Sequence, residues 1–93
     1  MRKIEPTSAF KRDFKREAKG RHAKVLQSEL PALLLLLATD LPLEARLRDH
    51  ALTGEWKDHR DCHVRPDLVL IYRKPDEETL QLVRLGSHSE LGL

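Results

Sequence analysis

The pattern of apolar and polar residues predicts an amphipathic helix near the N-terminus. Apolar side chains recur every four positions from residue 10 onward, and charged residues fill most of the positions between them. Thr7 or Ser8 offers an N-cap oxygen, and Gly20 ends the helix after about Lys19. The preceding segment, Arg2–Glu5, has the pattern of a short edge strand. The core-facing stripe of this helix is expected to consist of Phe10, Phe14 and Ala18.

A second helical pattern spans about Ala23 to Thr39. Pro31 lies inside it and predicts either a kink or a break, with Pro31 in the first turn of a restarted helix. Leu35 and Leu36 fall outside the apolar stripe. They are either exposed, as part of a groove for a partner protein, or buried on a second side of the helix. The stripe itself comprises Leu26, Leu30, Leu33, Leu34 and Leu37.

The C-terminal half has the pattern of an antiparallel sheet. A hairpin is predicted from two strands, about Trp56–Val64 and Leu68–Arg73, separated by a Pro-Asp turn. A third strand is predicted over about Thr79–Gly86, after a turn at Pro75–Glu78. Glu44–His50 is a polar connection with room for one helical turn. Two helices followed by an antiparallel sheet define an α+β fold class.

Length and composition fit one domain spanning residues 1–93. The chain is 40% apolar and 34% charged, as expected for a globular protein with a modest core. Its single cysteine, Cys62, rules out an internal disulfide and fits a reducing compartment. No secretory leader is evident, and the longest apolar run, Ala32–Ala38, is far shorter than the roughly 20 residues of a membrane span. These features predict a cytoplasmic protein without membrane association.

The net charge of +2 hides an uneven distribution along the chain. Residues 1–24 hold nine Lys/Arg against three Asp/Glu, and residues 25–93 hold eight against twelve. A basic segment on an otherwise acidic body predicts a polyanionic partner, with nucleic acid as the first candidate. The alternative is an ordinary solvated helix face that happens to be rich in lysine.

The first strand of the predicted hairpin carries an unusual set of polar residues. Side chains alternate along a strand, so one face is expected to carry Lys57, His59, Asp61 and His63. The opposite face is expected to carry Trp56, Cys62 and Val64 as core residues. Burying two histidines, a carboxylate and a lysine together is costly, so the polar face is predicted to be functional.

Two further histidines, His50 and His88, fall near the predicted sheet. If the third strand continued past Gly86, Arg84 and His88 would share a face and approach the hairpin. Such a set suits cleavage of an RNA phosphodiester by the neighbouring 2′-hydroxyl, which needs a base, an acid and positive charge at the phosphorane. Histidine serves as acid or base near neutral pH. Asp67 is a candidate base or orienting carboxylate, and Arg84 is a candidate phosphate ligand.

Metal binding is the alternative chemistry for these side chains. His59, Asp61 and His63 would lie about 6.6 Å apart along a strand face, and imidazole and carboxylate both bind zinc. The sequence contains no cysteine pair and no recognised ligand spacing, so no metal and no cofactor are expected. His22 lies among basic residues at a helix start and is expected to be an ordinary surface residue.

Four short motifs form a combined pattern, D-H-x-L-x-G, W-K, R-D-x-H-V-x-P-D and G-S-H. They lie in the segments Asp49–Gly54, Trp56–Lys57, Arg60–Asp67 and Gly86–His88, with Leu70–Arg73 and the rest of Arg84–Leu91 adding to the match. With these motifs the sequence resembles the RelE/ParE toxin superfamily, and most closely the YafQ branch of bacterial type II toxin–antitoxin systems. The resemblance covers nearly the whole chain, including the basic first helix.

The resemblance implies a microbial-RNase-like fold, in which two helices pack on a twisted antiparallel sheet. It also implies a metal-independent endoribonuclease that cuts mRNA in the ribosomal A site and so inhibits translation. The implied catalytic and positioning residues are His50, His63, Asp67 and His88, with Asp61 as a further site residue. The cations expected to contact RNA are Lys11, Lys15, Lys57, Arg60, Arg73 and Arg84. The implied partners are a cognate antitoxin, the 70S ribosome with its 16S rRNA, and mRNA; His59 has no counterpart in the family.

Two positions depart from the YafQ-like pattern. Gly92 stands where an aromatic residue usually follows the last histidine, and Leu68 replaces an aromatic often found after the Pro-Asp. An aromatic at position 92 could stack on a base, an interaction worth about 1–3 kcal/mol. These departures leave a second interpretation open, a catalytically weakened homologue that acts mainly as antitoxin-binding partner and operon co-repressor. A ParE-like toxin acting on gyrase shares the fold but lacks the histidine cluster.

Overall fold

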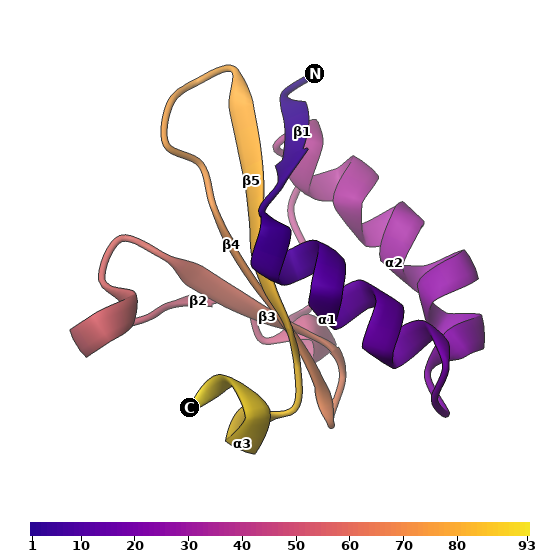
Figure 1. Cartoon of the computed structure of the whole chain (residues 1–93). Helices are drawn as coiled ribbons and strands as arrows, with labels where there is room; N and C mark the ends of the chain where they lie inside the picture. Colours follow the sequence, from indigo (N-terminus) through magenta and orange to yellow (C-terminus); the bar gives the residue numbers. More distant parts are fainter.

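A mixed five-stranded sheet forms the centre of the molecule in a computed structural model that covers residues 1–93 (Figure 1). The strands are β1 (Lys3–Pro6), β2 (His50–Ala51), β3 (Arg60–Arg65), β4 (Leu68–Arg73) and β5 (Thr79–Gly86). The helices are α1 (Ser8–Ala18), α2 (Ala23–Ala38) and α3 (His88–Leu91), with 3₁₀ turns at Ala45–Leu47 and Gly54–Trp56. The strand order is β1-β5-β4-β3-β2. The predicted α+β class is confirmed, but the sheet is not purely antiparallel, because β1 joins β5 in the parallel sense.

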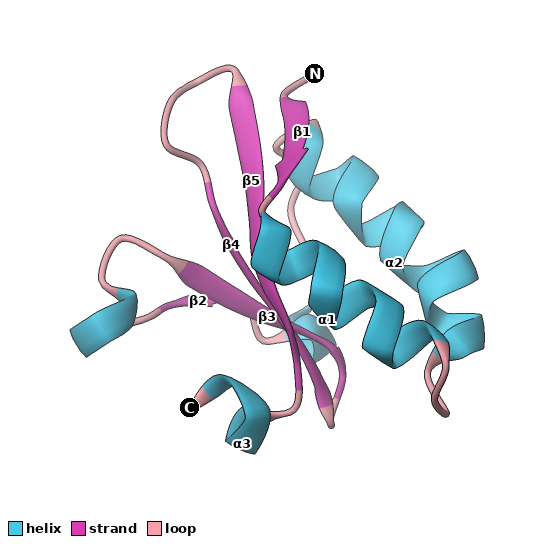
Figure 2. Cartoon of the chain, viewed as in Figure 1, coloured by secondary structure: helices cyan, strands magenta, loops and turns pink.

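The two faces of the sheet are covered by different elements. α1 and α2 lie together on one side of the sheet (Figure 2). The main core lies between these helices and the sheet, and β4 contributes Leu68 and Leu70 to it. The opposite face of β4 presents Val69 and Ile71, which pack against Leu91 of α3. β4 is therefore buried on both sides, which explains its unbroken apolar run.

α2 forms as predicted and continues through Pro31 without a break. Pro31 lies on the exposed side, so its missing N–H deprives only the carbonyl of solvent-exposed Gln27 of its helical partner. Leu35 is 55% exposed and Leu36 is half-buried, so Leu35 belongs to the exposed alternative. The predicted stripe is confirmed by the burial of Leu26, Leu30, Leu33 and Leu37 and the partial burial of Leu34. Neither α2 nor any other helix has the length and apolar character needed to cross a membrane.

α1 turns a partly polar face toward the sheet. Phe10 is buried as predicted, but Asp13 lies beneath the helix with only 3% of its surface exposed. Phe14 and Ala18 are exposed, so the expected apolar stripe is wrong beyond Phe10. The reason is the neighbour of α1: the helix lies along an edge of β5 that needs hydrogen-bonding groups.

Side chains of α1 and its cap complete the hydrogen bonding of β5. β1 pairs only with the first half of β5, which leaves the second half without a strand on that side. There Thr7 Oγ1 donates to the Val83 carbonyl at 2.8 Å. Leu85 N donates to Asp13 Oδ2 at 3.0 Å, and the Leu85 carbonyl accepts from Arg16 Nη2 at 2.9 Å. α1 thus acts as a polar substitute for a missing strand.

β3 starts later than the sequence predicts. The 3₁₀ turn at Gly54–Trp56 and a left-handed residue two positions later interrupt the strand pattern. Lys57 and His59 therefore lie outside the strand. The part of the predicted polar face that remains consists of Asp61 and His63, two residues apart on β3.

Candidate active site

Three histidines and one carboxylate converge on the sheet face opposite α1 and α2. His50 of β2 pairs with Asp61 of β3 at the edge of the sheet. His50 Nδ1 lies 3.1 Å from Asp61 Oδ1 and donates to the carbonyl of Arg48 at 2.7 Å. Arg48 has a left-handed φ of 48°, so a turn directly before β2 fixes the imidazole.

His63 and His88 complete the group. His63 shares the face of β3 that carries Asp61, and His88 is the first residue of α3. The His63 and His88 rings meet edge to face, with 5.0 Å between their centroids, and the His50 centroid lies 6.5 Å from that of His63. The structure therefore brings together four of the five side chains predicted for the catalytic set; we call these four residues the histidine cluster.

Asp61 lies under the histidines with 2% of its surface exposed. Burial raises the pKa of its carboxyl group, and the charges of His50, His63 and His88 only partly oppose this. Its Oδ1 is buried without a hydrogen bond, even though His50 Nδ1 is 3.1 Å away. The two observations agree, because the Nδ1–H of His50 is directed at the Arg48 carbonyl. Asp61 therefore retains an acceptor that a protonated histidine or a substrate hydroxyl can use.

His63 is held in the neutral form near neutral pH. Partial burial lowers its pKa, and the nearby charges of His88, Arg48 and His50 lower it further. Asp61 is the one neighbour that raises the His63 pKa, and its effect does not outweigh the others. A neutral imidazole has a free nitrogen lone pair, so His63 is suited to accept a proton.

A hollow of about 400 Å³ opens beside the histidine cluster. Its lining includes His50, Asp61 and His88 of the cluster, together with Trp56 and Gly92. Gly92 caps α3 with a left-handed φ of 71°, and a Cβ built on it would meet no atom within 4 Å. The hollow therefore includes the space next to the position where the family pattern has an aromatic.

The fifth predicted residue, Asp67, lies apart from this group in the turn between β3 and β4. Its carboxylate forms an ion pair with Arg21 and lies 3.6 Å from His22 Nε2. His22 is only 8% exposed, so the expectation of an ordinary surface residue is wrong. It was missed because nothing in its basic sequence surroundings shows that the turn packs over it. Leu68, the second departure from the family pattern, is fully buried in the main core.

The predicted RNA-binding cations divide into two groups. Arg84 donates to Asp13 through Nε at 2.6 Å and Nη2 at 3.2 Å, so it does not point at the histidine cluster as a free phosphate ligand. β5 ends at Gly86, and the expectation that Arg84 and His88 share a strand face is therefore wrong. Arg60 is bound to Asp49. The cations that remain without a carboxylate partner are Lys11, Lys15, Lys57 and Arg73.

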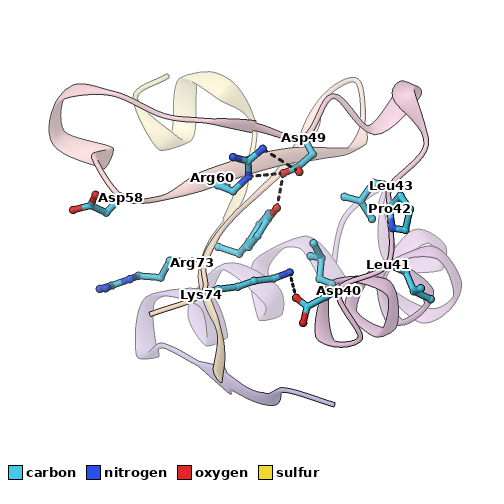
Figure 3. Close-up of a pocket in the computed structure, with 11 residues that line it drawn as sticks. Asp40, Leu41, Pro42, Leu43, Asp49, Asp58, Arg60, Arg73 and Lys74 are labelled. Atoms are coloured by element: carbon cyan, nitrogen blue, oxygen red, sulfur yellow. Dashed lines mark hydrogen bonds and ion pairs between the residues drawn. The ribbon is translucent and has the colours of Figure 1, made fainter. Parts of the chain in front are cut away.

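Asp49 directly precedes His50. Its hydrogen bonds anchor this segment on the side of the sheet edge away from the histidine cluster. Its carboxylate accepts from Arg60 Nε at 3.3 Å and Nη2 at 3.2 Å, and from the hydroxyl of buried Tyr72 (Figure 3). These side chains border a second hollow of about 560 Å³, on the side of Leu43 and the α2 C-terminus. Sequence analysis missed this role of Asp49; its position directly before His50 in the D-H motif was the available signal.

Tyr72→Phe is expected to lower the free energy of unfolding by about 1.5–3 kcal/mol, because it removes a hydrogen bond to a charged acceptor in a buried site. Urea denaturation measures the change. A double-mutant cycle with Asp49→Ala, which removes the acceptor, provides the control, since the two effects should not add if they report the same bond. Additive effects would show that Tyr72 stabilises the fold independently of Asp49.

No group of three or more His, Cys, Asp or Glu side chains has a geometry that could hold a metal ion. The set considered for a metal, His59, Asp61 and His63, is not one strand face. His59 precedes β3 and packs edge to face on Trp56, with 5.5 Å between ring centroids.

Comparison with known proteins gives one consistent result. A family model described as "Bacterial toxin of type II toxin-antitoxin system, YafQ" matches residues 2–92. The chain is 40% identical to the mRNA interferase toxin YafQ of Escherichia coli K12 over 91 residues, which cover 98% of this chain and 96% of that protein. A crystal structure of YafQ from E. coli BL21(DE3) has a TM-score of 0.82 at 39% identity and covers 98% of both chains. A chain in the crystal structure of the E. coli DinJ–YafQ complex has a TM-score of 0.81 at 40% identity, also over 98% of both chains.

Proposed function

Because this chain belongs to the YafQ family of bacterial toxins of type II toxin–antitoxin systems, we propose that it is a ribosome-dependent mRNA endonuclease. The observation that carries the proposal is the convergence of His50, His63 and His88 above buried Asp61. Proton transfer between such groups and an RNA substrate needs no metal. The relative named an mRNA interferase toxin supports the same reaction class.

In the proposed mechanism His63 is the base and His88 the acid. His63, neutral because of its lowered pKa, takes the proton of the 2′-hydroxyl, and the 2′-oxygen attacks the adjacent phosphorus. His88 donates a proton to the departing 5′-oxygen, which leaves a 2′,3′-cyclic phosphate on one fragment and a 5′-hydroxyl on the other. His50 stabilises the charge of the phosphorane, and its ring is held by the Arg48 carbonyl and by Asp61 Oδ1, which lie 2.7 Å and 3.1 Å from its Nδ1.

Asp67 is proposed to position substrate rather than to transfer protons. Its carboxylate is engaged by Arg21 and is not in an ion pair with any member of the histidine cluster. It reaches a bound RNA only when the Arg21 pair opens. The turn containing Asp67 directly follows the strand of His63, but its carboxylate is directed at Arg21 and His22 in the connection between α1 and α2.

The surface proposed to contact RNA is smaller than the sequence implies. Exposed Lys11 and Lys15 on α1, with Lys57 and Arg73, are the cations available for mRNA and 16S rRNA phosphates. Arg60 and Arg84 act instead within the fold, through Asp49 and Asp13. Because the proposed substrate is bound to the ribosome, the toxin is proposed to act in the cytoplasm.

The proposed protein partner is a cognate antitoxin. A relative is seen in complex with DinJ, which supports such a partner for this chain. Exposed Leu35, half-buried Leu36 and the basic outer face of α1 are proposed as parts of the contact. The second candidate function, an antitoxin-binding co-repressor with weak catalysis, is favoured by the empty space beside Gly92.

The test is mapping of mRNA cuts in a reconstituted translation reaction, with ribosomes omitted or chelator added in parallel. Cuts that need the ribosome, survive the chelator and disappear in His88→Ala support the endonuclease. Absence of cuts by folded protein supports the co-repressor, and Gly92→Phe is then the next variant. Because residue 92 has a left-handed φ, phenylalanine there costs about 1–2 kcal/mol, so its folding must be checked first.

A further inference from the structure

The guanidinium of Arg16 joins α1 to the end of β5 and to α3. Within α1, Nη1 donates to Asp13 Oδ1 at 3.0 Å and Nε donates to Glu17 Oε2 at 2.9 Å. Nη2 donates to the Leu85 carbonyl at 2.9 Å, and Nε lies 3.2 Å from Glu90 Oε2 in α3. This last contact is the only ion pair between α1 and α3, and we call it, with the bond to Leu85, the Arg16 clamp.

Gly86 provides the space that the clamp occupies. A Cβ on Gly86 would lie 2.9 Å from Arg16 Nη2 and 3.2 Å from Glu90 Oε1. A side chain here would therefore displace the ion pair. Gly86 does not have a positive φ, so the close approach of Arg16, rather than backbone conformation, accounts for glycine at this position.

Glu90 connects the clamp to the start of α3. Its Oε1 accepts from Ser87 N at 2.9 Å, and Ser87 Oγ accepts from Glu90 N at 3.2 Å. This capping box begins the helix, and His88 is the residue directly after Ser87. The other carboxylate oxygen, Oε2, is the one that faces Arg16.

Besides the contact of His88 with His63, α3 has one other side-chain anchor in the fold, the apolar side chain of Leu91. α3 is four residues long, and so short a helix is not stable by itself in water. Leu91 packs in a small apolar cluster with Val69 and Ile71. The ion pair to Arg16 adds a polar attachment of α3 to α1.

We propose that Arg16 is a positioning residue that holds α3 so that His88 stays in contact with His63. The inference rests on the proposed function, because the acid role of His88 makes its position matter for cleavage. Without the Arg16 clamp, α3 is tethered mainly through Leu91, and His88 moves away from His63. A displacement of about 1 Å at a catalytic group costs on the order of 100-fold in rate.

The first measurement is the rate of mRNA cleavage by Arg16→Gln and Glu90→Gln. Glu90→Gln removes the ion pair but keeps the capping box, since the glutamine oxygen still accepts from Ser87 N. The expected kcat falls by about 10- to 100-fold in both variants with KM nearly unchanged. Lys3→Gln is the matched control: it removes one exposed positive charge and its ion pair with Glu5 on β1, and it should leave kcat unaltered.

The second measurement is an NMR titration of the histidine rings, which needs no catalysis. The positive charge of His88 lowers the pKa of His63, so release of α3 should raise the His63 pKa in both variants. The other groups that face His63 are Asp61, His50 and Arg48, and neither substitution touches them. Lys3→Gln should titrate like the wild type.

Two outcomes overturn the inference. Wild-type kcat in Glu90→Gln shows that the ion pair does not position His88. An unchanged His63 titration in both variants, with any loss of activity explained by a smaller folded fraction, assigns Arg16 a purely structural role. If the wild type itself does not cut mRNA, the proposed function fails, and the titration alone then decides whether the clamp holds α3.

Discussion

Asp13→Ala is expected to lower the free energy of unfolding by about 3 kcal/mol, measured by urea denaturation. The buried carboxylate accepts from Arg84 Nε at 2.6 Å, from Arg16 Nη1 at 3.0 Å and from Leu85 N at 3.0 Å. Truncation leaves Leu85 N without an acceptor and Arg84 without its counter-charge. Breaking a buried ion pair from one side costs about 3–5 kcal/mol, and partial exposure of Arg84 places this case at the lower end.

The matched control is Glu77→Ala, which removes an exposed carboxylate without an ion pair and should change stability by less than about 0.5 kcal/mol. Equal midpoints for the two variants would contradict the assigned role of Asp13.

The stability of Asp13→Asn as a function of acid pH measures the contribution of the Asp13 charge, because asparagine keeps the shape of the side chain and removes its charge. Burial raises the pKa of Asp13, but the hydrogen bonds from Arg84 and Leu85 N, together with the charges of Arg84 and Arg16, outweigh it and hold the pKa below 3.8. A lowered pKa in the folded state adds stability above the unfolded value, and this stability is lost as pH falls through the folded value. The wild type should therefore lose more stability than Asp13→Asn as the pH falls below about 4. If the two proteins lose stability equally as the pH falls, the charge of Asp13 contributes nothing to stability.

The α2 stripe and the β4–β5 pair could be predicted because their apolar patterns are long and regular. β4 is apolar at nearly every position, and only a strand buried on both faces accounts for that at its length. β2, with two residues, has no pattern of its own; it exists because His50 and Ala51 pair with β3. The parallel pairing of β1 with β5 likewise has no local sequence pattern. It depends on the path that the chain takes through α1 and α2.

The stripe of α1 was predicted wrongly for a physical reason. Counting apolar residues selects Phe10 and Phe14, but a helix that lies on an open strand edge buries the residue that can accept a backbone N–H. Asp13 does so at Leu85, and Phe14 is left at the surface against Phe10, with 6.1 Å between their ring centroids. Local pattern contains no information about which strand edge lacks a partner.

The candidate site was partly predictable in the same sense. Side chains alternate between the two faces of a strand, so Asp61 and His63 lie on the same face of β3. This part of the site could be predicted from the sequence of β3 alone. The approach of His88 was expected from continued strand parity, yet it results from the turn at Ser87 into α3 and from the Arg16 clamp. These are tertiary contacts between residues far apart in sequence.

His63→Gln and His88→Gln are each expected to reduce ribosome-dependent cleavage by about 100- to 10,000-fold, the usual contribution of a general base or acid. His59→Gln is the matched control, because His59 packs on Trp56 outside the histidine cluster, and it should cleave at nearly the wild-type rate. All three proteins should retain the fold, since none of these side chains is fully buried.

The pH dependence tests the assignment of His63 as the base. A base must be deprotonated to act, so activity should fall as pH drops through the His63 pKa, and this limb should lie below 6.5, the ordinary value for histidine. Charge on Asp61 raises the His63 pKa, so Asp61→Asn should move the limb to still lower pH in whatever activity it retains. A limb above 6.5, or one that moves upward in Asp61→Asn, would reverse the roles of His63 and His88. Cleavage that survives the loss of both histidines would contradict the proposed catalytic set, whereas folded wild-type protein that neither cuts mRNA nor arrests growth would leave antitoxin binding as the main activity of this chain.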